Sequence, residues 1–280
     1  TTLKTALGVG LVAFAQGSIA QQENSLQLDT DAITVSGLSS GGFMATQFHL
    51  ANSDKVTGAA MLASGPYYCA QNDIAVALGQ CVDKVNSPLD VKALSAQAKS
   101  WEQAGKIPSL ANLKDDKVWL LHGTADTRVN SAVSDALYQQ YQQWVPATQL
   151  TYVNDKPFSH VFPTVDAGGS CLDSASPYIG KCEYDAAGEL LTALLGELNT
   201  PDDVLEGEVI SFDQQEIAGD DASTLADKGY AYIPASCSNG EACRVHVSFH
   251  GCNQYAEAVD MAYVEQTGLN RWADDNQLVV

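Results

Sequence analysis

The chain has 280 residues, 45% of them hydrophobic, which is enough to bury a substantial core. Its 34 acidic and 14 basic residues give a formal net charge of −20 at pH 7. This charge disfavours nucleic acid and anionic membrane surfaces as partners, because both repel an acidic protein. The sequence contains no phosphate-binding glycine loop, EF-hand or H-E-x-x-H motif, and we expect neither a cofactor nor a bound metal.

The first twenty residues have the three regions of a secretory signal peptide. They contain Lys4, the apolar run ALGVGLVAFA and the small residues Ser18-Ile19-Ala20. A membrane anchor is the alternative, but the apolar run has about ten residues, whereas a spanning helix needs roughly 20. We therefore predict a secreted, extracellular protein with no membrane association after cleavage, whose mature chain is 21–280.

Residues 33–48 (ITVSGLSSGGFMATQF) predict a strand, a sharp turn and a helix. The turn contains G-x-S-x-G from Gly37 to Gly41, the motif in which a strained turn exposes a nucleophilic serine. The residues two positions either side of that serine must be small. Ser39 meets this condition, whereas Ser40 has Leu38 two positions before it. A Ser/Gly-rich turn without chemistry is the alternative.

Strands and helices alternate through the following segments. Buried strands are predicted at 58–64 (GAAMLAS), 117–121 (KVWLL) and 149–153 (QLTYV), and helices at 42–51, 91–104, 133–144 and 185–198. This alternation is typical of the α/β class. We therefore predict a mostly parallel sheet with helices on both faces.

The pattern changes after the linker-like segment 200–203. Two strands with little room for helix between them are expected at 205–213 and 229–234 as an antiparallel pair. A further strand at 244–252 (RVHVSFHGC), one amphipathic helix around 258–274 and a terminal strand (LVV) follow. Neither half has an evident core of its own, so 21–280 is interpreted as one catalytic domain.

Seven cysteines fit an oxidising compartment. Six of them form three close pairs that could each staple a local loop: Cys69 and Cys81, Cys171 and Cys182, Cys237 and Cys243. Cys252 has no such partner in the sequence. It could be an exposed thiol or form an intermolecular disulfide. Because the sequence begins without Met and ends within an expected strand, we favour a third interpretation, in which the chain is C-terminally truncated and the partner of Cys252 lies beyond residue 280.

A nucleophilic serine needs a base to take its proton and an acid to orient that base. The carboxyl ends of parallel strands meet at one edge of a sheet, and Asp126 follows such an end. Asp115 and Asp116 begin the same strand, which places them roughly 20 Å away at the opposite edge. His160, in the loop after the next strand, is the predicted base.

The other histidines fit the role of base less well. His49 lies about 15 Å from Ser39 along a helix, and His246 lies inside a strand, where packing is expected. His122 shares a loop with Asp126 and is interpreted as a structural hydrogen-bonding group. The order serine, acid, histidine in Ser39, Asp126 and His160 is that of α/β-hydrolases.

An oxyanion hole needs two backbone N–H donors. One is assigned to Ser40, at the start of the helix, and the other to Cys252, where Gly251 allows close approach of the backbone. The alternative is that His250-Gly251 only ends a strand. In the ordinary hydrolase plan the His-Gly strand precedes the nucleophile, but here it follows the triad. We therefore predict a circularly permuted α/β-hydrolase fold, opened just before the nucleophile strand.

Together the motifs resemble a known family. GLSSGG, GTADTRVN, HVFPT, SPYIGKCEYDAAG and HGCNQ followed by TGLNRWADDNQLVV are similar to single-domain, circularly permuted extracellular poly(3-hydroxybutyrate) depolymerases, from about residue 30 to the end. The resemblance implies Ser39, Asp126 and His160 as the triad, Ser40 and Cys252 as oxyanion donors, and a disulfide from Cys252 to a cysteine beyond residue 280. It also implies no separate substrate-binding domain, and further crevice residues, including a tryptophan, in a C-terminal part that this sequence lacks.

The resemblance implies a secreted serine esterase that hydrolyses poly(3-hydroxybutyrate) and its oligomers through an acyl-enzyme, with the polyester as its partner. One alternative is a secreted carboxylesterase that acts on feruloyl or acetyl esters of polysaccharides. A second alternative, outside enzymes, is a non-catalytic hydrolase-fold binding protein.

Overall fold

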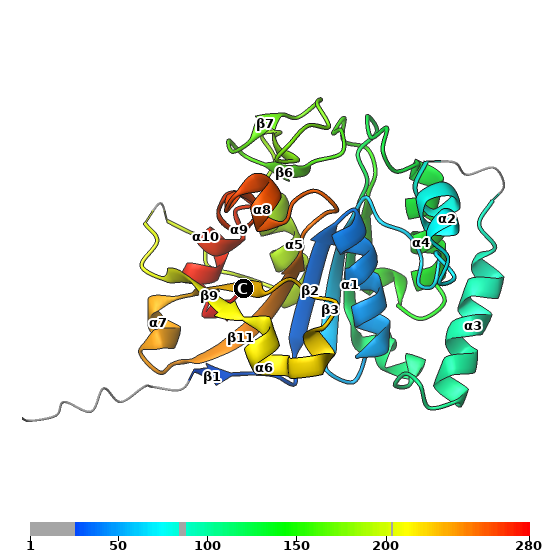
Figure 1. Ribbon diagram of the computed structural model, residues 1–280, viewed down its shortest axis with the longest axis horizontal. Coiled ribbons are helices and arrows are strands. Elements are labelled where there is room, and N and C mark those ends of the chain that lie inside the picture. The colour runs from blue at the N-terminus through cyan, green and yellow to red at the C-terminus, as the bar shows by residue number, and fades with distance from the viewer. Residues whose placement is uncertain (1–25, 84–87, 203) are drawn as a thin grey trace, which may run out of the picture.

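The computed structural model describes residues 26–83, 88–202 and 204–280 (Figure 1). The predicted signal peptide at 1–20 lies outside these residues. No helix in the described part of the chain is long and apolar enough to cross a membrane. The assignment of 21–280 to one catalytic domain stays a prediction.

A parallel sheet forms the centre of the fold, as the alternation of strands and helices predicts. Within the described residues its strands follow the order β1-β11-β2-β3-β4-β5, with β12 beside β11, and every pairing is parallel. The strands are β1 (Gln27–Leu28), β2 (Ile33–Leu38), β3 (Val56–Leu62), β4 (Lys117–Leu121), β5 (Leu150–Val153), β11 (Ala242–Phe249) and β12 (Leu278–Val279).

Helices cover both faces of this sheet, as expected when both faces of a parallel sheet are apolar (Figure 1). One face packs against α1 (Ser40–Ala51), α3 (Val91–Gln103) and α4 (Ser131–Tyr141). The other packs against α5 (Ala186–Leu195), α9 (Ala262–Gln266) and α10 (Leu269–Asp274).

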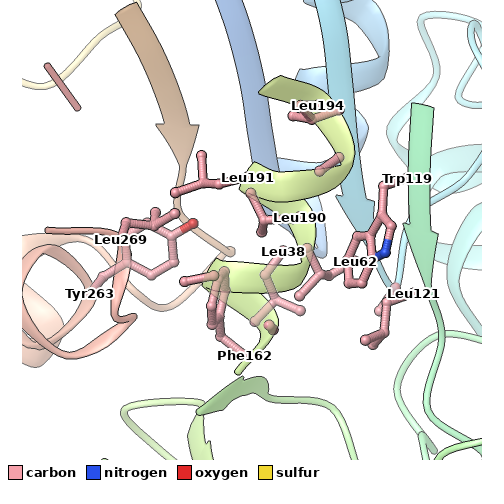
Figure 2. Packing of buried hydrophobic residues seen from close by; sticks show 14 of the residues in the cluster. Leu38, Leu62, Trp119, Leu121, Phe162, Leu190, Leu191, Leu194, Tyr263 and Leu269 are labelled. Atoms are coloured by element: carbon pink, nitrogen blue, oxygen red, sulfur yellow. The ribbon is translucent and has the colours of Figure 1, made fainter. Parts of the chain in front are cut away.

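Side chains of successive strand residues point to opposite faces of the sheet, and so they contribute alternately to the two apolar layers. Met61 and Leu120 belong to the layer under α1, whereas Leu62 and Leu121 belong to the layer under α5. Figure 2 shows the second layer, in which Leu190 of α5 lies over the sheet. Burial of both layers stabilises the sheet and leaves the ends of its strands to carry function.

Side-chain caps define where the long helices begin. The carboxylate of Asp90 accepts the Ala93 N–H at 2.9 Å and that of Asp185 accepts the Gly188 N–H at 2.9 Å. Each satisfies an N–H that has no carbonyl partner inside its helix. The starts of α3 and α5 are therefore encoded locally, close to the predicted boundaries.

The remaining elements lie outside the main sheet. β6 (Phe162–Thr164), β8 (Ile179–Lys181) and β7 (Gly169–Ser170) form a small parallel sheet above the carboxyl ends of the main strands (Figure 1). β9 (Glu208–Asp213) and β10 (Lys228–Ile233) form the predicted antiparallel pair. Short helices complete the chain: α2 (Ile74–Leu78), α6 (Gln214–Ala218), α7 (Ala235–Ser238), α8 (Ala256–Val259), a π-helix (Gly79–Asp83) and 3₁₀ helices at Leu110–Asp115, Ala147–Gln149 and Gly219–Ala222.

Two of the predicted details are wrong. The single helix expected at 258–274 is broken into α8, α9 and α10, because Asp260 (φ 51°) and Gly268 (φ 85°) adopt left-handed backbone conformations that a continuous helix does not allow. The connection between β9 and β10, expected to hold little helix, contains α6 and a 3₁₀ turn.

Three disulfides join the cysteine pairs predicted from their spacing: Cys69 to Cys81, Cys171 to Cys182, and Cys237 to Cys243. Cys252 has a free thiol and is exposed. β11, which carries the His-Gly end, follows β2 to β5 in the chain and lies beside β2. This neighbourhood is what the circular-permutation hypothesis requires, and the permutation itself stays an interpretation.

Candidate active site

Ser39 stands at the sharp turn between β2 and α1, as the motif predicts. Its backbone has φ 57° and ψ −123°, a conformation that non-glycine residues rarely adopt and that marks stored strain at functional turns. The Ser39 N–H donates to the Leu62 carbonyl of β3 at 2.9 Å, and its carbonyl accepts the Phe43 N–H at 2.9 Å. The turn is therefore held from both the sheet and the helix.

Two glycines make this turn possible. A Cβ on Gly37 would overlap the backbone of Gly41 at the start of α1. A Cβ on Gly41 would overlap the Phe249 carbonyl at the end of β11. The requirement for small residues on both sides of Ser39 is thus a requirement for close packing of β2, α1 and β11.

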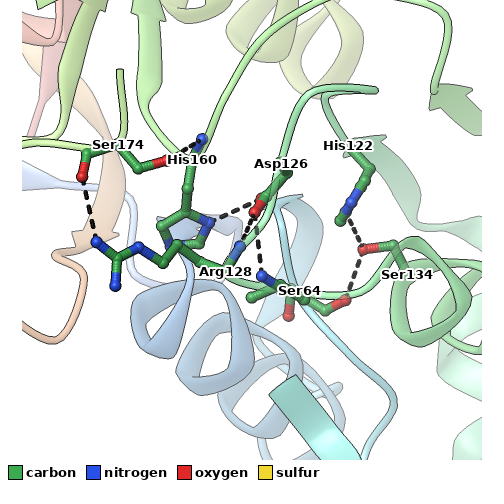
Figure 3. A network of polar contacts seen from close by, with 8 residues as sticks. Ser64, His122, Asp126, Arg128, Ser134, His160 and Ser174 are labelled. Atoms are coloured by element: carbon green, nitrogen blue, oxygen red, sulfur yellow. Dashed lines mark hydrogen bonds and ion pairs between the residues drawn. The ribbon is translucent and has the colours of Figure 1, made fainter. Parts of the chain in front are cut away.

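His160 and Asp126 form an ion-pair-type contact at the same edge of the sheet (Figure 3). The His160 Nδ1 lies 2.7 Å from the Asp126 Oδ2, and the two side chains are 8% and 1% exposed. The Asp126 Oδ1 accepts the backbone N–H groups of Arg128 at 2.7 Å and Val129 at 3.0 Å. This carboxylate is therefore fixed on one side by its own turn and can orient the imidazole on the other.

Backbone hydrogen bonds join the two loops that carry this pair. The Thr124 N–H donates to the Lys156 carbonyl at 2.8 Å, and the Ala125 N–H donates to the Phe158 carbonyl at 3.0 Å. The His160 N–H donates to the Ser174 Oγ at 3.1 Å, within the loop that the Cys171–Cys182 disulfide closes. Several backbone hydrogen bonds and a disulfide-closed loop therefore hold the two residues in place, in addition to the hydrogen bond between their side chains.

The electrostatics of Asp126 favour its charged form. Burial by itself raises the pKa of this carboxyl, but the hydrogen bond and charge of His160 and the N–H groups of Val129 and Arg128 outweigh it. The pKa of Asp126 is therefore lowered from its ordinary value of 3.8. A carboxylate that is ionised at neutral pH holds the proton of the facing imidazole on Nδ1 and leaves Nε2 as the acceptor.

The loop after β11 lies against the nucleophile turn. The Gly251 N–H donates to the Oε1 of Gln254 at 2.8 Å, and the Nε2 of Gln254 donates to the Pro177 and Tyr178 carbonyls at 2.9 and 3.2 Å. Ser40 is the first residue of α1, so its N–H has no carbonyl partner within the helix. The proposed oxyanion donor Cys252 therefore lies in a loop held by the hydrogen bonds of Gln254, and the proposed donor Ser40 lies at the fixed start of a helix.

A cavity of about 150 Å³ brings these parts together. Its lining includes both Ser39 and His160, together with the oxyanion-loop residue Cys252. Within the described residues no hydrogen bond joins the Ser39 hydroxyl to the His160 ring, and such contacts commonly tighten only when substrate binds. The complete set of lining residues is Leu38, Ser39, Arg128, His160, Tyr178, Gly251, Cys252, Asn253 and Gln254.

The remaining histidines have the surroundings that the sequence predicts. His246 is 1% exposed and its ring nitrogens contact Thr34 and Ser36 at 2.9 and 2.8 Å. Burial lowers the pKa of His246 to about 3, so it stays neutral. His122 is 3% exposed and its Nδ1 contacts the Ser134 Oγ at 2.8 Å (Figure 3).

Besides Leu38, four residues of the cavity wall have no role assigned from the sequence: Arg128, Tyr178, Asn253 and Gln254. Each lies in a segment that the sequence analysis singled out for another reason, but none stands at a spacing that predicts chemistry. Their place in the wall depends on loops that meet only in the folded chain. Across the described residues, no group of three or more His, Cys, Asp or Glu side chains could hold a metal ion.

Comparison with known proteins gives close relatives. The chain is 38% identical to the "Poly(3-hydroxybutyrate) depolymerase" of Delftia acidovorans, over 98% of this chain and 56% of that protein. It is 35% identical to the "Polyhydroxybutyrate depolymerase" of Talaromyces funiculosus, over 96% of this chain and 79% of that protein. The chain thus spans little more than half the length of the Delftia relative. No family model matches the sequence.

Solved structures give the same relationship. The fold superimposes on the crystal structure of the PHB depolymerase from Penicillium funiculosum with a TM-score of 0.83, at 35% identity, over 92% of this chain and 80% of that one. It matches equally well a serine-to-alanine variant of a PHB depolymerase complexed with an R3HB trimer.

Proposed function

The chain belongs to the polyhydroxybutyrate depolymerase family, and from that premise we propose that it is a serine esterase that hydrolyses poly(3-hydroxybutyrate) and its oligomers through an acyl-enzyme. The observation that carries the proposal is the cavity whose wall contains both Ser39 and His160, with Asp126 2.7 Å behind the imidazole. The R3HB trimer bound by the serine-to-alanine variant of a relative supports the choice of substrate.

In the proposed mechanism Ser39 attacks the ester carbonyl while the Nε2 of His160 takes its proton. Asp126 holds the Nδ1–H of His160 and stabilises the imidazolium that forms. The N–H groups of Ser40 and Cys252 donate to the developing oxyanion. His160 then protonates the leaving hydroxyl, and in the second half-reaction it takes a proton from the water that hydrolyses the acyl-enzyme.

Replacement of the nucleophile tests the proposal. The variant Ser39→Ala should lose turnover of both p-nitrophenyl butyrate and poly(3-hydroxybutyrate) film, by roughly 10³-fold or more, because the neighbouring alcohol, Ser40, begins α1 and does not line the cavity. Ser100→Ala, an exposed position on α3, is the matched control and should keep wild-type rates. Retained hydrolysis of both substrates by Ser39→Ala would contradict the assignment.

Two further measurements separate this function from its rivals. Release of ferulate or acetate from polysaccharide at rates above those on polyester would favour a carboxylesterase of other substrates. Failure of Ser39 to react with a fluorophosphonate probe would favour a binding protein instead.

We propose that the protein acts outside the cell. Its three disulfides fit an oxidising compartment. The Cys171–Cys182 disulfide closes the loop that contacts the His160 backbone, so reduction would loosen the site itself.

A further inference from the structure

Arg128 gives the cavity wall a positive charge that the proposed mechanism does not use. Among the described residues that line the cavity, it is the one with a permanent positive charge. No carboxylate in the described part of the chain forms an ion pair with its guanidinium, and its side-chain contact is a long one of 3.5 Å from Nη2 to the Ser174 carbonyl. Four of its five donors are thus available to a ligand.

The backbone and side chain of Arg128 place it on the His160 side of the cavity. Both residues contact Asp126, through the Arg128 N–H at 2.7 Å and the His160 Nδ1 at 2.7 Å. Both also contact Ser174, Arg128 through its guanidinium and His160 through its backbone N–H (Figure 3). This is the side on which a leaving group must lie, because His160 protonates the leaving oxygen.

The chemistry of a 3-hydroxybutyrate oligomer supplies a partner for this charge. At the acid end, the alcohol component of the last ester carries a free carboxylate. Four covalent bonds of about 1.4 Å separate the ester carbonyl carbon from that carboxylate carbon, so the two lie roughly 5 Å apart. A protein with a net charge of −20 repels such an anion unless a local cation offsets the field.

We propose that Arg128 is a specificity-determining residue that binds the terminal carboxylate of hydroxyalkanoate oligomers, so that soluble oligomers are cleaved at their acid end. In this step Ser39 Oγ forms a bond to the acyl carbon of the last ester, and the bond from that carbon to the alcohol oxygen breaks. His160 transfers its proton to this oxygen and free 3-hydroxybutyrate leaves; water then releases the shortened oligomer. The inference rests on the proposed function, since it assigns the substrate end that the same site selects.

The test compares a substrate with and without the carboxylate charge. The kcat/KM of wild type, Arg128→Gln and Arg128→Lys is measured on the R-3-hydroxybutyrate trimer as free acid and as methyl ester. Arg128→Gln should lower kcat/KM for the free acid by about fivefold to tenfold, as expected for loss of a charge-assisted hydrogen bond at an exposed site. The kcat/KM for the methyl ester should stay within about twofold of the wild-type value. Arg128→Lys should restore part of the loss, because it keeps the charge but not the planar fork.

Two controls distinguish a specific loss of carboxylate binding from a general effect of charge or of misfolding. Lys181→Gln removes an exposed positive charge from β8, outside the cavity wall, and should not change the ratio of the two substrates. Turnover of p-nitrophenyl butyrate, which has no carboxylate, reports whether each variant is folded and competent.

Mass analysis gives a second readout. With a trimer whose acid-end unit carries ¹³C, the first monomer released by wild type should carry the label. An unlabelled first monomer, or an equal loss of rate on acid and methyl ester in Arg128→Gln, would overturn the inference while leaving the esterase intact. Hydrolysis of none of these esters by wild type would overturn the proposed function and this inference with it.

Discussion

The molecule contains two histidine–aspartate pairs, one at each end of β4. His160 and Asp126 lie at the carboxyl end of the strand with 2.7 Å between Nδ1 and Oδ2. His49 and Asp116 lie at the amino end with 2.9 Å between Nε2 and Oδ2. The two pairs have the same chemical groups, nearly the same separation and nearly the same burial.

The difference lies in the second nitrogen of each ring. The His49 Nδ1 lies 2.9 Å from the Tyr141 hydroxyl, whose pKa is raised by burial and by the Asp116 charge, so this hydroxyl stays protonated and can donate. Both ring nitrogens of His49 therefore have hydrogen-bond partners, Tyr141 and Asp116, and its side chain is 0% exposed. The His160 Nε2 has no hydrogen bond within the described residues, and His160 lines the cavity that contains Ser39.

The comparison shows that a histidine–aspartate pair is not by itself a catalytic signal. The pair at the amino end joins α1, α4 and the start of β4, and both ring nitrogens of its histidine are engaged in that packing. The pair at the carboxyl end keeps one acceptor for a substrate proton. Asp→Asn at each pair should therefore have different consequences.

The largest effect is expected for Asp126→Asn. An amide at this position can donate to the His160 Nδ1, which forces the ring proton onto Nε2 and removes the acceptor that Ser39 needs. We expect kcat/KM on p-nitrophenyl butyrate to fall by about 10³-fold to 10⁴-fold, measured by steady-state kinetics. A variant that retained more than a tenth of wild-type activity would remove Asp126 from the proposed triad.

A smaller effect, on stability instead of turnover, is expected for Asp116→Asn. The charge-assisted hydrogen bond to buried His49 becomes a neutral one, at a cost of about 1 kcal/mol in the free energy of unfolding, the difference between the two kinds of hydrogen bond. Urea unfolding measures that loss, and kcat of the folded fraction should stay within about twofold of wild type. A loss of kcat with unchanged stability would mean that the His49–Asp116 pair affects catalysis at Ser39 and His160.

The smallest effect concerns the acid side of the stability curve. The pKa of Asp126 in the folded state is below its ordinary value of 3.8, so its stabilising contribution is present above about pH 4 and is lost as the pH falls through the folded pKa. The difference in Tm between wild type and Asp126→Asn should therefore shrink from about pH 4 downward. Thermal unfolding followed from pH 6 to pH 2 checks this, and a constant difference would show that the carboxylate charge does not stabilise the fold.

Local signals made part of the fold and site predictable. Alternating apolar strands and capped helices from 33 to 198 specify the parallel sheet, because each element is encoded by its own periodicity and end groups. Ser39 was identifiable because the strained turn demands small neighbours. His160 and Asp126 were predicted because strand ends share one edge of the sheet, and the structure brings the two together.

The sequence by itself therefore determined the elements, the disulfide pairs and the candidate triad, since these depend on short spacings or on the order of strands. The tertiary structure alone decided that His49 meets Asp116, that Arg128 enters the cavity wall and that left-handed residues break the helix expected at 258–274. The physical reason is that these features depend on contacts between distant segments and on the packing of the surrounding loops. The energies of such contacts are fixed only when the whole sheet has assembled, and no local pattern records them.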